Sequence, residues 1–442
     1  MSPRAQYPRR TAAILRRLRA YESRNVTHLD PTAGWPIVWT RARDCHVWDA
    51  EGRRYLDLTA AFGVAAAGHA NPRVVRAGQR QMARLLHAMG DVHPHPLKAE
   101  LARALSRLTF ERWSGGRLRA KCLFTNSGFE AVEAALKTAL LATGRPGVLA
   151  FAGGYHGLGY GALTTTHREY FRAPFRPQLA GFAEFAPYPE QPAEVAPALE
   201  FVQRRLRAGD TGAVLVEPVQ GRGGIRVPPP EFLPGLRAAC TRHGACLVLD
   251  EIYTGLGRTG RWFACEHTGV VPDLVCLGKA LTGGFPLSVC VGRADLMDAA
   301  WPESPGEALH TSTYLGHPVG CAMALAQMAE IRRRRLVERS ARLGAVLRRD
   351  LESLRARDGG WRLAVRGLGL MVGLELRRPD GAPAGAEALR VVQALLRRGY
   401  LLLPEGEHGQ VISFTPPLTI GETDLRRCVR ALGEVLRDEW RR

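Results

Sequence analysis

Lysine is scarce in this sequence of 442 residues. It occurs only at positions 98, 121, 137 and 279, although Lys and Arg together number 61. Arginine therefore supplies positive charge almost everywhere, and lysine remains where arginine cannot serve. Arginine cannot form a Schiff base, because its guanidinium is never deprotonated in practice. This argument singles out Lys279, which stands in the glycine-rich stretch LGKALTGGFP.

Long apolar runs are also missing. No stretch of about 18 uncharged apolar residues exists, so we expect no membrane-spanning segment. Arginines interrupt every apolar run of the basic N-terminus, which therefore lacks the apolar core of a signal peptide. The leucines there recur at helical spacing and predict a short amphipathic surface helix. The expected location is the cytoplasm.

The nine cysteines include no CxxC pair, and several stand inside apolar runs. This pattern favours buried free thiols in a reducing cytosol over disulfides, and it predicts no metal site. The cysteines are Cys45, Cys122, Cys240, Cys246, Cys265, Cys276, Cys290, Cys321 and Cys428.

The net charge of +19 raises the hypothesis of a basic protein that binds nucleic acid. However, the arginines are scattered through predicted helices without interleaved aromatic residues. Heavy use of Arg, Ala, Gly and Leu with almost no Lys is typical of GC-rich coding rather than of a phosphate-binding surface. We therefore expect no nucleic-acid partner.

Short apolar runs alternate with helical patterns in the middle of the chain. Runs that are apolar throughout suit parallel strands covered on both faces, and their alternation with helices predicts a doubly wound α/β domain. The expected helices include 129–143 and 232–244. The expected strands are 121–126, 147–153, 212–218, 246–252, 274–280 and 287–292.

The two ends of the chain have a different pattern. Residues 47–58 predict a hairpin that turns at Glu51-Gly52, and a long Arg-rich helix is expected after about residue 325. Mixed strand and helix patterns follow. We therefore expect a smaller α+β domain built from both termini, with residues 1–75 and 326–442 against a large α/β domain of residues 76–325.

Three features end or follow predicted strands, where α/β sheets place ligand sites. Ser127-Gly128 opens a helix whose free N–H groups suit a phosphate, with Ser127 as helix cap. Asp250 ends one apolar strand and Lys279 follows another. Taken singly, these are an ordinary helix start, an acidic loop residue and a surface lysine. Together they are the parts that a pyridoxal 5′-phosphate (PLP) site needs.

The run from LVLDEI through GRTGRWFACEH to VVPDLVCLGKALTGGFPL carries a specific resemblance. It resembles the class III (ornithine, 4-aminobutyrate and ω-amino acid) aminotransferases of PLP fold type I. The resemblance extends from Val47 to Thr419. It implies a ping-pong transfer of an amino group from an amine or amino acid, with an ω-amine favoured, to a keto acid. A racemase or epimerase on the same scaffold is the alternative.

The resemblance also implies a role for individual residues. Lys279 matches the lysine that binds PLP, Asp250 the partner of the pyridine nitrogen, and Glu217 the carboxylate near the ring hydroxyl. Thr313 resembles a threonine that reaches the phosphate of the neighbouring subunit, which implies a homodimer with shared active sites and leaves a tetramer open. The other expected cofactor-binding residues are Ser127, Gly128 and Phe129 at the phosphate, and Tyr155, His156, Ile252 and Tyr253 around the ring.

Two departures from the family pattern concern the substrate. The family usually has a Glu where Arg222 stands and an Arg near Ser413, and the two form a pair that switches between substrates. Because both members are replaced, we hypothesise that Arg222 binds the substrate carboxylate from the other wall. Phe62 and Met89, with His93, are expected near the substrate entrance.

The third departure is Tyr253, which stands where the family often has Gln. Its phenol is expected either to bond the ring oxygen or only to pack.

Overall fold

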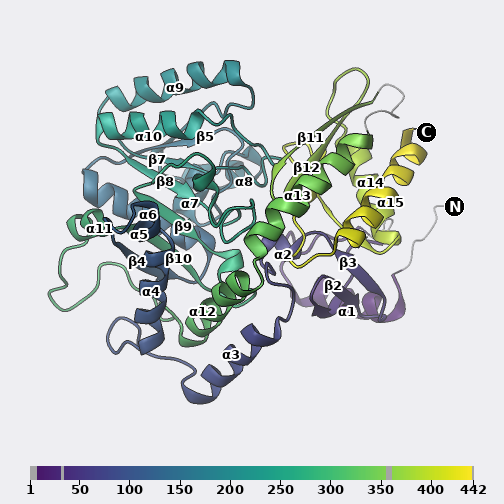
Figure 1. Ribbon diagram of the computed structural model, residues 1–442, viewed down its shortest axis with the longest axis horizontal. Coiled ribbons are helices and arrows are strands. Elements are labelled where there is room, and N and C mark those ends of the chain that lie inside the picture. The colour runs from purple at the N-terminus through teal and green to yellow at the C-terminus, as the bar shows by residue number, and fades with distance from the viewer. Residues whose placement is uncertain (1–6, 31–33, 355–360, 441–442) are drawn as a thin grey trace.

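The computed structural model describes residues 7–30, 34–354 and 361–440. Two lobes make up the molecule (Figure 1): one surrounds a seven-stranded sheet, and the other contains two four-stranded sheets. Within the described ranges, none of the helices has the length and apolar character needed to cross a membrane. All nine cysteines are free thiols, and eight of them are buried.

The large sheet has the order β4-β10-β9-β8-β7-β5-β6. It confirms the predicted mainly parallel α/β fold, with two corrections: β10 runs antiparallel to both of its neighbours, and β6 was not predicted. The strands are β4 (Ala120–Thr125), β5 (Gly147–Phe151), β6 (Ala183–Ala186), β7 (Thr211–Val216), β8 (Cys246–Asp250), β9 (Leu274–Leu277) and β10 (Ser288–Arg293).

The central strands β7, β8 and β9 are buried on both faces, which explains why they are almost entirely apolar. Along β8, Val248 packs in a core cluster with α6 (Gly128–Thr143), whereas Leu249 packs on the opposite side in a cluster with α10 (Phe232–His243). Successive residues of a strand point to opposite faces, so a sheet covered on both sides needs apolar residues at every position.

The other helical segments as far as residue 333 are α1 (Arg9–Tyr21), α2 (Ala60–Gly63), α3 (Pro72–Arg84), α4 (Pro96–Leu108), α5 (Phe110–Trp113), α7 (Tyr160–Thr165), α8 (Glu169–Arg172), η1 (Ala173–Gln178), α9 (Pro192–Arg207), η2 (Ala264–His267), η3 (Lys279–Leu281), α11 (Ala294–Ala300) and α12 (Pro318–Arg333). The helix α1 confirms the helix predicted near the N-terminus.

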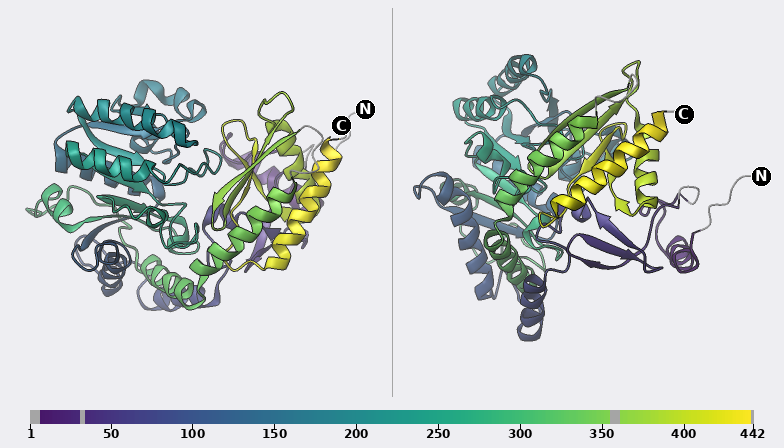
Figure 2. Two further views of the ribbon diagram at one scale, coloured as in Figure 1. Left: turned by 45° about the horizontal axis from the view of Figure 1, so that its top comes forward. Right: turned by 45° about the vertical axis from the view of Figure 1, so that its right-hand side comes forward.

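The second lobe brings the two ends of the chain together (Figure 2). Its first sheet contains the predicted hairpin of β2 and β3, and the late strand β13 pairs in parallel with β3. Its second sheet has the order β11-β12-β15-β14. The strands are β1 (Trp39–Arg43), β2 (His46–Asp49), β3 (Arg54–Asp57), β11 (Arg362–Leu368), β12 (Met371–Arg377), β13 (Tyr400–Leu401), β14 (Leu403–Glu405) and β15 (Val411–Phe414).

Three helices follow α12, namely α13 (Leu336–Glu352), α14 (Gly385–Arg397) and α15 (Glu422–Trp440). The single long Arg-rich helix expected after residue 325 is wrong, because the chain breaks between α12 and α13. Arg335, at the break, has a φ of 50°, in the left-handed region that helices do not use.

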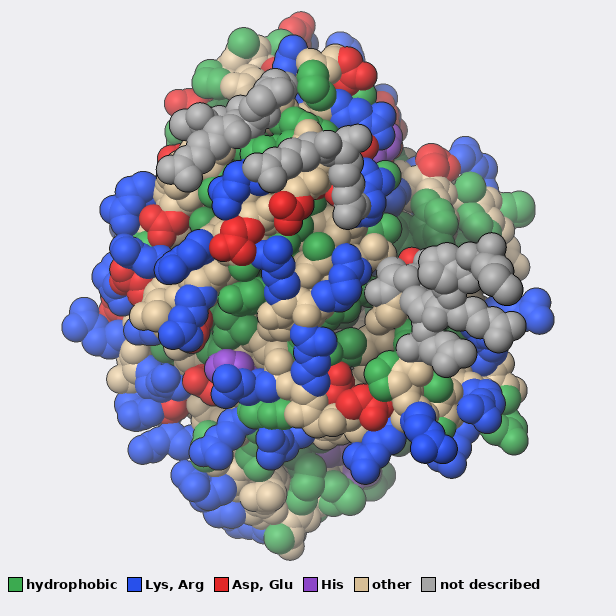
Figure 3. Space-filling view, turned by 90° about the vertical axis from the view of Figure 1, so that its right-hand side faces the viewer, with side chains coloured by type: hydrophobic (Ala, Val, Ile, Leu, Met, Phe, Trp, Pro, Cys, Tyr) green, Lys and Arg blue, Asp and Glu red, His purple; other side chains and the backbone are tan. Residues whose placement is uncertain are grey.

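Basic side chains are spread over the face of the molecule in Figure 3, and acidic side chains lie among them. Two ion pairs connect α14 to α15. Arg390 of α14 lies 2.5 Å from Glu439, and Arg398, the residue that follows α14, lies 2.7 Å from Glu434. Acidic neighbours therefore offset part of the excess positive charge locally.

Arg258 connects the loop after β8 to the second lobe. The side chain is buried, and its guanidinium donates to the carbonyl oxygens of Leu370 and Pro416 at 2.9 and 2.6 Å. No carboxylate of the described chain lies within 4.0 Å of it, so these carbonyl bonds are its main compensation for burial.

We expect Arg258→Met to lower the stability by about 2–4 kcal/mol, because two buried carbonyl oxygens lose a charged donor. Thermal unfolding of the variant measures this as a lower Tm. Arg261→Met is the matched control, since Arg261 is exposed three residues further on. Equal Tm values for the two variants would contradict the assignment of Arg258 as a connection between the lobes.

Candidate active site

A cavity of about 430 Å³ lies where β7, β8 and β9 end and where α6 begins. The carboxyl ends of parallel strands meet at one edge of a sheet, so side chains far apart in the sequence come together there. The cavity is lined by Gly128, Phe129, Tyr155, His156, Gly157, Leu158, Glu217, Arg222, Asp250, Ile252, Tyr253 and Lys279.

Asp250 is the last residue of β8 and is buried at the cavity wall. The buried His156 donates from Nδ1 to Asp250 Oδ2 at 2.8 Å, and the backbone N–H of Ile252 donates to Oδ1 at 3.1 Å. A buried carboxylate is costly unless it is hydrogen-bonded. These two donors hold Asp250 in one orientation, which suits it to face a cation in the cavity.

Glu217 is a second buried carboxylate of the cavity. It accepts hydrogen bonds from the backbone N–H groups of Tyr155 and Gly221, both at 2.9 Å. The pKa of Glu217 is raised to about 7, mainly by burial and also by the nearby Asp250, while His156 and the two backbone N–H groups oppose the rise. Its charge therefore responds to its surroundings near neutral pH.

Lys279 follows β9 and is partly buried, with its Nζ 3.8 Å from the ring centroid of Tyr253. Burial lowers the pKa of Lys279, and the carboxylates Asp250, Glu217 and Glu405 oppose this effect. A lower pKa makes the neutral, nucleophilic amine more accessible. The backbone of Lys279 has a φ of 40°, a conformation that non-glycine residues adopt rarely and that is found more often at functional sites.

The phenol of Tyr253 bonds to Thr415 Oγ1 at 3.0 Å. The phenol was expected either to bond the cofactor's ring oxygen or only to pack. In the structure its hydroxyl is bonded within the protein, and its aromatic ring packs against Lys279.

Ser127 stands at the N-cap position of α6, but the prediction that its side chain caps the helix is wrong. Its hydroxyl is buried and has no hydrogen-bond partner in the structure. A Cβ at Gly128 would lie 3.0 Å from Ile252 Cδ1, so a larger residue there would push the Ile252 side chain aside. A free buried hydroxyl at the start of a long helix suits an anion such as a phosphate.

Arg222 lies at the cavity wall, where its guanidinium carbon is 4.9 Å from the ring centroid of Tyr155 and 5.5 Å from that of Phe171. The same side chain approaches Glu405, with Nε 3.9 Å from Oε2. Sequence reasoning missed Glu405 and expected Arg222 to bind the substrate carboxylate, with no acidic partner within the protein. Glu405 comes soon after the apolar run Leu401–Leu403, just as Asp250 ends an apolar run. The same pattern could therefore have drawn attention to Glu405.

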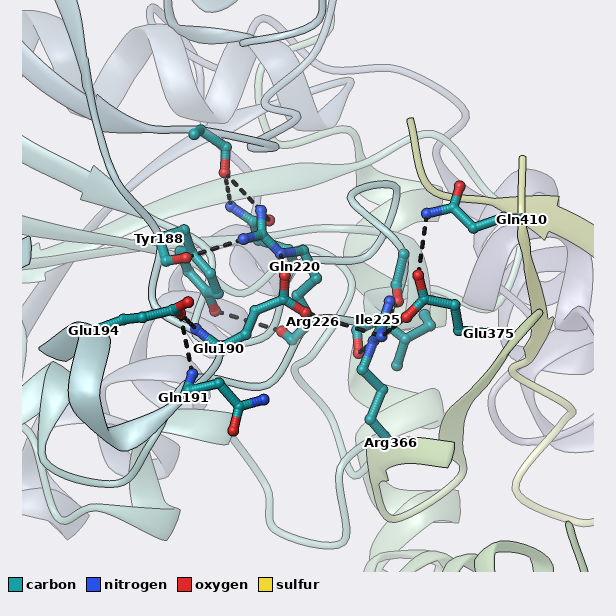
Figure 4. A network of polar contacts seen from close by, with 12 residues as sticks. Tyr188, Glu190, Gln191, Glu194, Gln220, Ile225, Arg226, Arg366, Glu375 and Gln410 are labelled. Carbon is teal, nitrogen blue, oxygen red and sulfur yellow. Dashed lines mark hydrogen bonds and ion pairs between the residues drawn. The ribbon is translucent and has the colours of Figure 1, made fainter. Parts of the chain in front are cut away.

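The loop that carries Arg222 is held at both ends (Figure 4). On one side, Arg226 Nη1 donates to Gln220 Oε1 at 3.1 Å, and its Nε lies 2.8 Å from Glu190. On the other side, Arg366 Nε donates to the carbonyl oxygen of Ile225 at 3.1 Å. The backbone of the loop is therefore fixed, whereas the Arg222 side chain remains 43% exposed.

Several predicted site residues lie away from the cavity lining. Phe62 is 59% exposed and lines a separate apolar cavity with Trp35 and Leu402, and Met89 is 54% exposed. Ser413 is buried within β15 between β12 and β14, and Thr313 and His93 are exposed. Among the described residues, no group of three or more His, Cys, Asp or Glu side chains could hold a metal ion.

Comparison with known proteins decides the family. The model of the family named aminotransferase class-III matches residues 30–436. The chain belongs to the class III aminotransferases. It is 38% identical over 410 residues to the acetylornithine aminotransferase of Methanopyrus kandleri, covering 93% of this chain and 97% of that protein. It is 35% identical over 440 residues to the 5-aminovalerate aminotransferase DavT of Pseudomonas aeruginosa, covering 96% and 97%.

The fold agrees with this family. A PLP-bound amine transaminase from an uncultivated Pseudomonas species superposes with a TM-score of 0.86 at 28% identity, covering 95% of this chain and 98% of that one. This class III aminotransferase is thus a PLP-dependent enzyme that transfers amino groups, and the comparisons give no support to the racemase alternative. The unpartnered Ser127 hydroxyl, the buried Asp250 and the cavity lysine fit that cofactor.

Proposed function

We propose that this aminotransferase takes an amino group from a primary ω-amine and gives it to a keto acid in two half-reactions. The proposal rests on one observation: the Lys279 amine and the Asp250 carboxylate line the same cavity. The ω-amine is supported by the relatives named for acetylornithine and 5-aminovalerate, which cover nearly the whole chain.

Each site residue then has a role toward PLP. Asp250, positioned by His156, would hold the pyridine nitrogen of PLP, and Glu217 would serve the ring hydroxyl. Tyr155, Ile252 and Tyr253 would enclose the ring, and Ser127, Gly128 and Phe129 would bind the phosphate. When bound, PLP supplies an acceptor for the electrons of the ionising substrate C–H bond.

The chain's own groups handle protons and charge. With PLP bound, the Lys279 amine would take the proton from the substrate carbon that bears nitrogen and would deliver it to a carbon of the cofactor in the same half-reaction. The negative charge of Asp250 would keep a proton on the pyridine nitrogen of bound PLP. The first half-reaction releases a carbonyl product, and the second converts the keto acid to an amino acid, so the enzyme returns to its starting state.

We also propose a homodimer in the cytoplasm, in which Thr313 of one subunit reaches the phosphate of the other; a tetramer built from two such dimers is compatible with this. Nine free thiols suit a reducing compartment. The proposed domain division, with boundaries near residues 75 and 325, is supported by the pairing of β3 with β13, which joins the two termini. We assign the exposed Phe62 and Met89 to the outer substrate path.

A panel of ω-amines, diamines and α-amino acids, with pyruvate and 2-oxoglutarate as acceptors, tests the proposal. We expect ω-amines to convert bound PLP to pyridoxamine phosphate in the absence of a keto acid, followed spectroscopically. Conversion by α-amino acids alone would contradict an ω-amine donor.

Arg222→Gln is expected to raise the KM for the keto acid by about 10- to 100-fold, because a bond between a guanidinium and the substrate carboxylate is lost. The rate with a saturating amine donor in the first half-reaction should change little. Steady-state kinetics of the variant measure both values. An unchanged KM for the keto acid would show that Arg222 does not bind its carboxylate.

A further inference from the structure

We propose that Glu405 forms an anionic subsite for a second, distal ammonium group of the amine donor. Diamines, and other donors with a cation at the far end, are then the preferred substrates. This inference rests on the aminotransferase function proposed above and names the donor class for the same site.

Glu405 is a buried carboxylate at the end of β14. Within the described chain, Arg222 is the sole cation that comes within 4.0 Å of it, and the two are 3.9 Å apart, too far for a direct hydrogen bond. Burial raises the pKa of Glu405, while Arg222, Lys279 and Arg168 oppose this effect. Because so little positive charge lies beside this buried carboxylate, a further cation that reaches it is bound favourably.

Arg222 is a poor permanent partner for this carboxylate. Its side chain is 43% exposed, and its guanidinium also lies over the rings of Tyr155 and Phe171. Its backbone is fixed, because the N–H of Gly406 donates to the Arg222 carbonyl oxygen at 3.1 Å. The guanidinium can therefore turn between Glu405 and the cavity without movement of the loop.

The two charges consequently differ in mobility. Glu405 is held within a strand that pairs with β15, whereas Arg222 is a long side chain at the wall. When Arg222 turns to the carboxylate of a keto acid, Glu405 is left as a fixed negative charge. It is close enough to Lys279 for each to influence the pKa of the other. An ammonium group can take the place of Arg222 there.

This arrangement separates donors by the charge at their far end. A diamine with one nitrogen at Lys279 presents its second nitrogen to Glu405. A donor with a distal carboxylate meets the same negative charge unless Arg222 intervenes. A monoamine has nothing to offer Glu405 and serves as a neutral reference.

The test compares three four-carbon donors: 1,4-diaminobutane, n-butylamine and 4-aminobutyrate. Each is titrated into the PLP-loaded enzyme without keto acid, and the loss of the PLP absorbance is followed. We expect the wild type to reach half-conversion at a lower concentration of the diamine than of the monoamine. Glu405→Gln should weaken the apparent affinity for the diamine by about 10- to 100-fold and leave n-butylamine unchanged.

Glu407→Gln is the matched control, because Glu407 is exposed two residues further on and its loss removes the same charge. It should change neither titration. Calorimetric titration with butyltrimethylammonium, a cation that cannot be transaminated, gives a readout independent of turnover. Its binding should weaken in Glu405→Gln and persist in Glu407→Gln.

Failure can be assigned to one proposal or the other. If no donor, including n-butylamine, converts the cofactor, the proposed function fails. If n-butylamine reacts but Glu405→Gln leaves the ratio of diamine to monoamine affinity unchanged, the subsite is overturned. A wild-type preference for 4-aminobutyrate that Arg222→Gln removes would also overturn it, because Arg222 would then select the donor.

Discussion

Replacing Lys279 by arginine is expected to abolish transamination, with a loss in kcat of at least about 10⁴-fold, the upper end of what a positioned proton-transfer group contributes. A guanidinium keeps its proton in the cavity, so it can neither attack a carbonyl carbon nor take a proton from the substrate. The positive charge is retained, so the neighbouring Asp250, Glu217 and Glu405 keep a cation nearby.

Lys121→Arg is the matched control. Lys121 is an exposed lysine that pairs with Asp298, and arginine can keep that pair. Steady-state rates with a responsive amine donor and 2-oxoglutarate should be normal for this control. A Lys279→Arg enzyme with more than about one-hundredth of the wild-type rate would contradict the role of Lys279 as proton carrier.

Asp250→Asn is expected to lower kcat by about 10²- to 10³-fold, the usual effect of removing one fixed electrostatic partner of the reacting system. In Asp250→Asn the amide oxygen can accept from the Ile252 N–H, while the amide NH2 takes the place of Oδ2 and can donate to His156 Nδ1 in the other imidazole tautomer, so the local geometry should persist. What is lost is the negative charge that favours a protonated pyridine nitrogen.

Two measurements separate this effect from misfolding. The Tm of Asp250→Asn should stay near the wild-type value, and the absorbance spectrum of bound PLP should change because the protonation of the ring changes. Asp298→Asn, a change at an exposed aspartate, should alter neither. A fully active Asp250→Asn enzyme would show that the carboxylate charge has no part in the reaction.

The fold was largely predictable because the sheet is buried on both faces, which forces apolar runs at the strand positions. Strand direction leaves no such mark, so the antiparallel course of β10 was missed. The strand β6 is only four residues long and includes Glu184, which hid it among polar segments. The break at Arg335 depends on a positive φ that arginine gives no reason to expect.

The centre of the site was predictable because its parts follow strand ends in a recognisable order. Lys279 and Asp250 come together in one cavity for that reason, and Glu217, which only the family resemblance pointed to, follows β7 into the same cavity. The order of residues along the chain does not predict which side chains lack a hydrogen-bond partner. Ser127 is of a residue type that often caps helices, yet its hydroxyl has no partner in the structure.

Glu405 was missed because it is 183 positions from Arg222 in the chain, and only the packing of the second lobe brings the pair within reach. Pairwise contacts between lobes depend on tertiary structure. The local sequence around either residue contains no signal for its partner.

The central claim is that Lys279 holds the cofactor, and borohydride reduction tests it most directly. Reduction of the PLP-loaded enzyme, followed by proteolysis and mass spectrometry, shows which lysine carries the pyridoxyl group. The chain has four lysines, which makes the assignment unambiguous. We predict the group on Lys279. A group on Lys98, Lys121 or Lys137, or no stable incorporation at all, would contradict this account.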